Sequence, residues 1–123
     1  MHITERTIGD ITILDLDGKL TIDDGAELLR DKVASVVFQD RKKVLLNLAG
    51  VPYMDSGGLG ELVRSSMVAR KANGAVKLMC LTSKITDLLT ITKLLTIFDT
   101  FDTEAEALAS FGEAASAPST VAT

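Results

Sequence analysis

The sequence has few aromatic residues, one cysteine and one histidine. Aromatic residues make up 4% of the 123-residue chain and tryptophan is absent, so the core must be aliphatic. The single cysteine, Cys80, excludes an internal disulfide and a metal site built from several cysteines. Because Cys80 lies in the apolar run AVKLMCL, we expect a buried, inert thiol there.

The chain also lacks the features of a nucleic-acid-binding or membrane protein. Its formal net charge is −4, which does not favour association with nucleic acid or an anionic lipid surface. The longest apolar stretch, LLTITKLLTIF, contains Lys93 and is too short and too polar to span a bilayer. The segment MHITERT has no apolar signal-peptide core. We therefore expect a cytoplasmic protein that binds neither nucleic acid nor membrane.

Hydrophobic periodicity predicts one domain in which strands alternate with helices. Two strands flank a turn at Gly9 and Asp10, so the chain is expected to open with a β-hairpin. The strands are expected at 3–8, 11–16, 44–48, 75–81 and 96–101, and the helices at 21–38, 57–74, 83–94 and 102–111. The order β-β-α-β-α-β-α-β-α predicts an α/β domain with a small mixed β-sheet and helices packed on it. We expect this domain to span residues 1–112, with a disordered tail at 113–123.

Particular residues are expected to begin these helices. Asp24, followed one turn later by Glu27, predicts a capping arrangement for the first helix. Ser83 is expected to cap the third helix, and Asp102 or Thr103 the last. The second helix is expected to bury one apolar stripe, made of Leu59, Leu62, Val63 and Met67.

The stretch VPYMDSGGLGELV, residues 51–63, places Ser56 between an aspartate and two glycines, where a strand ends and a helix begins. A serine nucleophile on such an elbow needs a glycine two residues earlier, where this chain has Met54, and the only histidine is His2. A nucleotide-binding loop is only weakly indicated. The G-x-x-x-x-G-K-[ST] spacing is missing, and Asp55 would repel a phosphate.

Two interpretations of Ser56 stay open. As a helix N-cap, its hydroxyl would accept one backbone N–H bond and stabilise the chain by about 1 kcal/mol. Gly57 and Gly58 cost helix propensity, up to about 1 kcal/mol each, which a simple cap does not require. Glycines would let a large partner such as a kinase approach the hydroxyl closely. Phosphorylation there would add about −1.5 to −2 charges at neutral pH.

The residues YMDSGGLGELV resemble the D-S-[ST]-G-[LI]-G motif of STAS domains, the anti-sigma factor antagonists of bacterial partner-switching systems. The resemblance covers residues 3–112 and includes DGKL, KVLLNL, GAVKLMCL and ITKLLTIFDTF in the expected order. It implies that an anti-sigma factor, which is an ATP-dependent serine kinase, phosphorylates the motif serine. The unmodified antagonist binds that kinase and frees the sigma factor. The phosphorylated form cannot bind until a PP2C-type phosphatase resets it.

Carried onto this chain, the resemblance makes Ser56 the phosphoacceptor and Asp55 the adjacent motif acid. Gly57 replaces the second Ser or Thr of the motif, which leaves Ser56 as the only acceptor in the loop. The remaining motif residues, expected to contact the partner, are Gly58, Leu59 and Gly60.

The resemblance also implies a partner-binding loop after the hairpin, where this chain departs from the family. Many members carry G-x-L-D there, and the acid faces the partner, whereas this chain has Thr21 at that position. Asp23 or Asp24 would supply the charge from a shifted position. Asn47, in the strand before the motif, is expected to make a structural bond to the following loop.

We therefore expect a non-enzymatic switch protein that needs no cofactor, metal or small-molecule substrate. Its partners would be an anti-sigma factor serine kinase and a PP2C-type phosphatase. The same fold also permits a STAS adaptor or scaffold that does not switch, as in stressosomes or lipid-transport accessory subunits. Loss of the phosphoacceptor would favour the adaptor, so the pair Asp55 and Ser56 argues against it.

Overall fold

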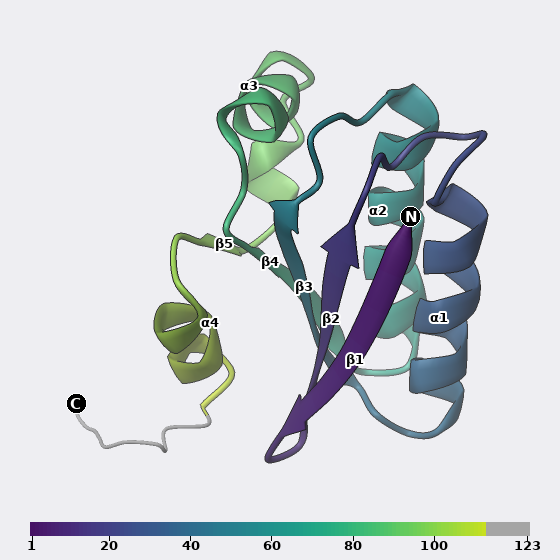
Figure 1. The fold of residues 1–123 in the computed structure, drawn as a ribbon. Coiled ribbons are helices and arrows are strands. Elements are labelled where there is room, and N and C mark those ends of the chain that lie inside the picture. Colours follow the sequence, from purple (N-terminus) through teal and green to yellow (C-terminus); the bar gives the residue numbers. More distant parts are fainter. Residues whose placement is uncertain (113–123) are drawn as a thin grey trace.

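The computed structural model describes residues 1–112 as a five-stranded sheet covered by helices (Figure 1). In chain order the elements are β1 His2–Ile8, β2 Ile11–Asp17, α1 Ala26–Phe38, β3 Lys43–Gly50, α2 Ser56–Lys71, β4 Ala75–Met79, α3 Ser83–Ile91, the 3₁₀ helix η1 Leu95–Ile97, β5 Thr100–Phe101 and α4 Glu104–Ser110. The predicted order of strands and helices is confirmed. The predicted tail at 113–123 lies outside the described residues.

The sheet is mixed, as predicted, with strand order β1-β2-β3-β4-β5. β1 and β2 form the expected antiparallel hairpin, in which Ile8 pairs with Ile11 across a turn whose Gly9 has a φ of 60°. β2, β3, β4 and β5 run parallel, because helical crossovers return the chain to the same edge. α1 and α2 cover one face of the sheet, and α4 lies against the other (Figure 1).

The core is aliphatic and lies on both faces of the sheet. The larger cluster packs alternate strand residues such as Leu14 and Leu46 against α1, α2 and α3. The smaller cluster lies under α4 and consists of Ile11, Ile13, Leu45, Met79 and Ala107. β3 therefore sends buried side chains to both faces, as expected of a parallel strand covered by helices on both sides.

Three local predictions were wrong. The predicted strand at 96–101 is a 3₁₀ turn followed by a two-residue strand. Met67 is 52% exposed, because it does not lie on the same side of α2 as Leu62, whereas Ala69 follows Leu62 by about two turns and is fully buried. Cys80 follows β4 with a φ of 59° and is half-buried rather than buried.

The helix starts also differ from prediction in two places. α1 begins after Gly25, whose φ is 96°, and no side chain caps it, so the capping role of Asp24 is wrong. α3 is capped by Thr82, whose Oγ1 accepts from the Ile85 N–H at 3.3 Å, and Ser83 is its first residue. Thr103, one of the two residues expected at α4, does cap it.

Candidate functional site

Asp55, not Ser56, is the N-cap of α2. The Asp55 backbone is extended, with φ −103° and ψ −175°, and its Oδ1 accepts from the Gly58 N–H at 2.8 Å. Ser56 is the first residue of the helix and is exposed. Among residues 1–112 no group bonds the Ser56 hydroxyl. Of the two interpretations of Ser56, the helix cap is therefore wrong.

The Asp55 carboxylate also holds the β2–α1 loop against the β3–α2 loop, and both loops lie at the same end of the sheet (Figure 1). Its Oδ1 and Oδ2 accept from the Ile22 N–H at 3.2 and 3.3 Å. The backbone adds bonds from the Asp55 N–H to the Leu20 carbonyl at 3.3 Å and from the Leu20 N–H to the Tyr53 carbonyl at 3.0 Å. The N–H groups, chiefly that of Gly58, hold the pKa of Asp55 below its ordinary value, so this carboxylate is ionised near neutral pH.

The two glycines after Ser56 lie against the neighbouring β2–α1 loop, which leaves no space for a side chain at either position. A Cβ on Gly57 would lie 2.5 Å from the Ile22 Cβ, and a Cβ on Gly58 would collide with the Leu20 carbonyl oxygen. The interpretation that these glycines exist to admit a partner is therefore corrected. Gly60 differs from both, because a Cβ there would meet no atom within 4 Å.

Of the three residues expected to contact the partner in the β2–α1 loop, Thr21 and Asp24 are engaged within the chain. The Thr21 Oγ1 accepts from the Asp24 N–H at 3.0 Å and donates to the Asp24 carbonyl at 3.3 Å, so Thr21 closes a turn. The Asp24 carboxylate lies 3.1 Å from the amino group of Met1. Asp23 is exposed and has no partner among the residues that the structure describes.

Of the remaining predicted site residues, some are buried in the core and others are exposed at the surface. Leu59 is 7% exposed and belongs to the larger core cluster, and Gly58 is buried as well. Gly60 is exposed on the first turns of α2. Ile22 was not among the predicted site residues, and its side chain is 70% exposed beside the serine loop. The feature of the sequence that could have indicated this exposed residue is an apolar side chain inside the otherwise polar turn TIDDG.

A buried acid lies on α2, one turn after Gly57. Glu61 is 5% exposed, and its Oε2 has no hydrogen-bond partner within residues 1–112. Burial raises the pKa of Glu61, against the opposing effect of the Arg64 guanidinium, whose Nε lies 3.8 Å from Oε1. A charged Glu61 is therefore costly in this position.

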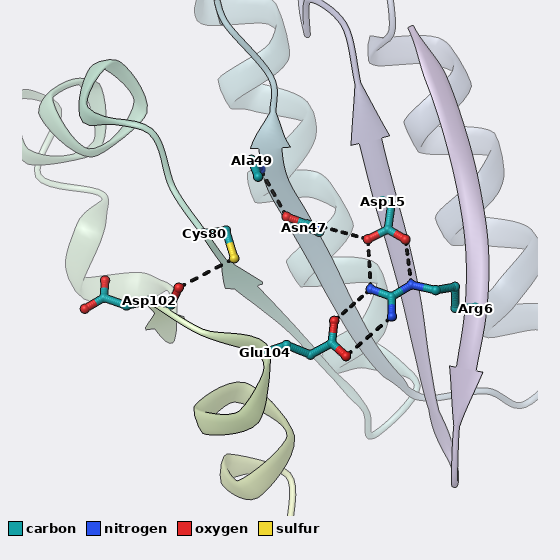
Figure 2. Close-up of polar contacts among 7 residues, drawn as sticks. All are labelled: Arg6, Asp15, Asn47, Ala49, Cys80, Asp102 and Glu104. Carbon is teal, nitrogen blue, oxygen red and sulfur yellow. Dashed lines mark hydrogen bonds and ion pairs between the residues drawn. The ribbon is translucent and has the colours of Figure 1, made fainter.

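On the opposite face of the sheet, a polar network ties α4 to the hairpin (Figure 2). The Arg6 guanidinium donates to Asp15 at 2.6 and 3.0 Å and to Glu104 at 2.7 Å. Asn47 donates to Asp15 at 2.8 Å and accepts from the Ala49 N–H at 3.1 Å, so its role is structural as expected, but its partners lie in β2 and β3 and not in the following loop. Arg6 holds the pKa of Asp15 below its ordinary value. This network fixes the fold and presents no open site.

Two further observations concern the described part of the chain. Within residues 1–112 no group of three or more His, Cys, Asp or Glu side chains is placed to hold a metal ion. None of the described helices is both long enough and apolar enough to cross a membrane.

These features define a small α/β domain that presents a free serine at the start of the helix after its central strand. The family model for the STAS domain matches residues 2–107. The chain belongs to the STAS domain family.

Solved structures agree with this assignment. A candidate anti-sigma factor antagonist from Thermotoga maritima, TM1081, is 26% identical over 88% of this chain and 92% of its own, with a TM-score of 0.82. The phosphorylated Bacillus cell fate determinant SpoIIAA is 19% identical over 89% of this chain and 99% of its own, with a TM-score of 0.71. The murine anion transporter Slc26a9 matches 89% of this chain with 18% of its own, at 17% identity and a TM-score of 0.73. The last two show the fold alone. No curated protein sequence matches the chain.

Proposed function

We propose that this chain is an anti-sigma factor antagonist of a bacterial partner-switching system. In its unphosphorylated form it binds an anti-sigma factor that is a serine kinase, and the sigma factor is released. Phosphorylation of Ser56 by that kinase abolishes binding, and a PP2C-type phosphatase restores it. The observation that carries the proposal is the exposed, unbonded Ser56 hydroxyl on a loop held in place by Asp55.

The local electrostatics support a switch that acts on the partner rather than on the fold. A phosphate on Ser56 would add about −1.5 to −2 charges next to the ionised Asp55. The Gly58 N–H at the start of α2 already bonds Asp55 and is not available to the phosphate. The added charge would therefore stay on the docking surface. Burying it there without a partner costs several kcal/mol, about enough to reverse binding.

The other parts of the proposal follow because the partner, and not this chain, transfers the phosphate. The ATP site and the catalysis belong to the kinase, so the antagonist itself would be non-enzymatic and would need no cofactor. Such a switch would act in the cytoplasm, where sigma factors and their regulators meet. It would bind protein partners, and neither nucleic acid nor membrane.

Phosphopeptide mapping of the protein from its native cells, grown under two conditions, tests the proposal. Phosphate on Ser56 whose occupancy changes between the conditions is the expected result. An unmodified Ser56 in both conditions would contradict it. That result would favour a STAS adaptor or scaffold that does not switch, an alternative motivated by the presence of this fold in the Slc26a9 transporter.

A further inference from the structure

Two large apolar side chains are exposed on the outer sides of α1 and α2, which face away from the sheet. Phe38, at the C-terminal end of α1, is 92% exposed, and Met67 of α2 is 52% exposed. Met67 lies in a shallow hollow of about 450 Å³ along α2. The other residues that line this hollow are Gly60, Val63, Arg64, Val68 and Lys71. Arg64 follows Ser56 by eight residues, or about 12 Å of helix, so most of the hollow lies away from the serine loop.

The outer side of α1 is acidic and ends in an aromatic ring. Asp31 and Phe38 are seven positions apart, which is about two helical turns, so they lie on the same side of the helix. The residues buried on the sheet side are Leu29, Val33 and Val36. Asp31 is 72% exposed, and its contact with Arg30 at 3.9 Å is loose. Lys32 does not offset this charge, because it pairs with Glu5 of β1 at 2.6 Å.

The outer side of α2 has the opposite charge. Arg64, Met67 and Lys71 are three and four positions apart, so they form one exposed stripe. Arg64 is 65% exposed, and its contact with Glu61 at 3.8 Å is loose. The Lys71 ammonium has no ion-pair partner within residues 1–112. This stripe therefore combines an apolar side chain with two available cations.

The acidic and the basic stripes lie at the same height. α1 and α2 lie side by side on one face of the sheet and run in the same direction, because each connects two parallel strands (Figure 1). After burial and Arg64, the charges of Arg30 and Asp31 are the next influences on the pKa of Glu61, so Asp31 is about level with Glu61. Phe38, seven residues later, is then about level with the hollow at Val68.

We propose that this chain forms a two-fold dimer through the outer sides of α1 and α2, with Phe38 of each copy in the α2 hollow of the other. The two-fold axis runs between the two helices and along them, so it places the acidic stripe of one copy opposite the basic stripe of its mate. Asp31 of each copy pairs with Arg64 of the other. Each Phe38 ring meets the Met67 side chain and the Lys71 ammonium, and a cation over an aromatic ring is attracted to it.

Complementary charge on one molecule favours a second copy as the occupant of the hollow. A basic, apolar hollow by itself would accept any acidic protein with an apolar side chain. This chain carries the matching acid and aromatic residue on the adjacent helix, at the same height, so one symmetric contact satisfies both stripes at once. The dimer goes beyond the proposed function, since none of its contacts uses Ser56.

The test is sedimentation equilibrium of the full chain at low salt. Loading concentrations should run from about 10 µM to about 1 mM, because a face made of two short helices is small for a specific interface. We expect the wild type to pass from monomer to dimer over this range. Asp31→Lys and Arg64→Glu should each stay monomeric, since each places like charges opposite one another in both halves of the interface. An equimolar mixture of the two variants should associate, because the mixed dimer pairs opposite charges in both halves.

Further variants locate the contact. Phe38→Ser should raise the dissociation constant of the dimer by about tenfold or more, because it leaves the hollow empty. Ile91→Ser is the matched apolar control, since Ile91 is 77% exposed on α3. Lys84→Glu is the matched charge control, at an exposed position of the same helix. Both controls should dimerise as the wild type does, and circular dichroism checks that every variant is folded.

Four results would overturn the proposal. The first is a wild-type chain that stays monomeric over the whole range. The others are charge variants that dimerise alone, a mixture of them that does not associate, and a Phe38→Ser variant with the wild-type dissociation constant. If an unrelated acidic protein occupied the hollow instead, the wild type would be monomeric and the first result would be seen. No step of the test uses Ser56 or its phosphate, so the dimer and the switch can fail separately.

Discussion

The carboxylate of Asp55 bonds the backbone of Ile22, which lies 33 residues earlier in the chain. One side chain thus caps α2 and fastens the β2–α1 loop beside Ser56. The serine loop and the β2–α1 loop are therefore held together by this carboxylate.

Asp55→Ala should destabilise the protein, and Ser56→Ala should not. The first change removes a cap and the bonds to Ile22, whereas the Ser56 hydroxyl has no partner among the described residues. The loss for Asp55→Ala should exceed that for Thr103→Ala, which removes the cap of α4 and a bond to Glu106 but no bond to another loop. Urea unfolding followed by circular dichroism measures all three. A destabilised Ser56→Ala with a stable Asp55→Ala would show that the cap is assigned to the wrong residue.

Ser56→Ala should bind the anti-sigma factor constitutively, and Ser56→Asp should weaken binding by about tenfold or more, because it places a second charge beside Asp55. Isothermal titration calorimetry with the purified partner measures both affinities. Ser83→Asp is the matched control, since Ser83 is also an exposed first residue of a helix behind a cap, on α3. Equal affinities of the two Ser56 variants would rule out the switch.

Gly60→Ala should stabilise the protein by about 0.5–1 kcal/mol, because an alanine side chain at this exposed helical position meets no other atom. Gly58→Ala should destabilise it, because the new Cβ collides with the Leu20 carbonyl oxygen. Thermal unfolding compares the two variants. A Gly60→Ala variant that is more stable but binds the partner more weakly would show that the partner approaches α2 closely at this point.

Glu61→Gln should raise the free energy of unfolding at neutral pH by about 1 kcal/mol, since a buried carboxylate oxygen without a partner is costly. Burial raises the pKa of Glu61 in the folded protein above its ordinary value of 4.5, so the native state favours the protonated form. The cost of Glu61 therefore appears as the pH rises through the raised pKa and vanishes below about pH 4.5.

Unfolding in urea at neutral and at acidic pH checks this prediction. The gain from Glu61→Gln should be present at neutral pH and absent in acid. Glu27→Gln, at an exposed position on α1, should show no gain at either pH. A Glu61→Gln variant that is less stable at neutral pH would mean that the ion pair with Arg64 outweighs the cost of burial.

The sequence was sufficient to predict the order of the elements and the serine loop, because both rest on local patterns. Alternation and helical period predict the strands and helices, and the DSGGLG stretch marks the loop. The cap of α2 could not be decided in this way, since Asp55 and Ser56 are neighbours and equally good caps. Only the extended backbone at Asp55 distinguishes them.

The remaining errors concern contacts between distant parts of the chain. Nothing near Gly57 in the sequence indicates that Ile22 packs against it, so the glycines were attributed to a partner. The exposure of Ile22 follows from the same contact and could not be read from its apolar character. The Asp24 carboxylate was expected to cap a helix, but it pairs with the amino group of Met1 at 3.1 Å.

The bridge between Arg6 and Glu104 has a consequence for biosynthesis. The two residues are 98 positions apart, and they join the first strand to the last helix (Figure 2). During translation the hairpin and the helices α1 and α2 emerge from the ribosome well before Glu104 does, at about 5–20 residues per second. Until then the Arg6 guanidinium has only Asp15 as an acidic partner in this network. The nascent chain can thus pair β1 to β4 before α4 is made, and α4 covers the opposite face of the sheet only after Glu104 has emerged.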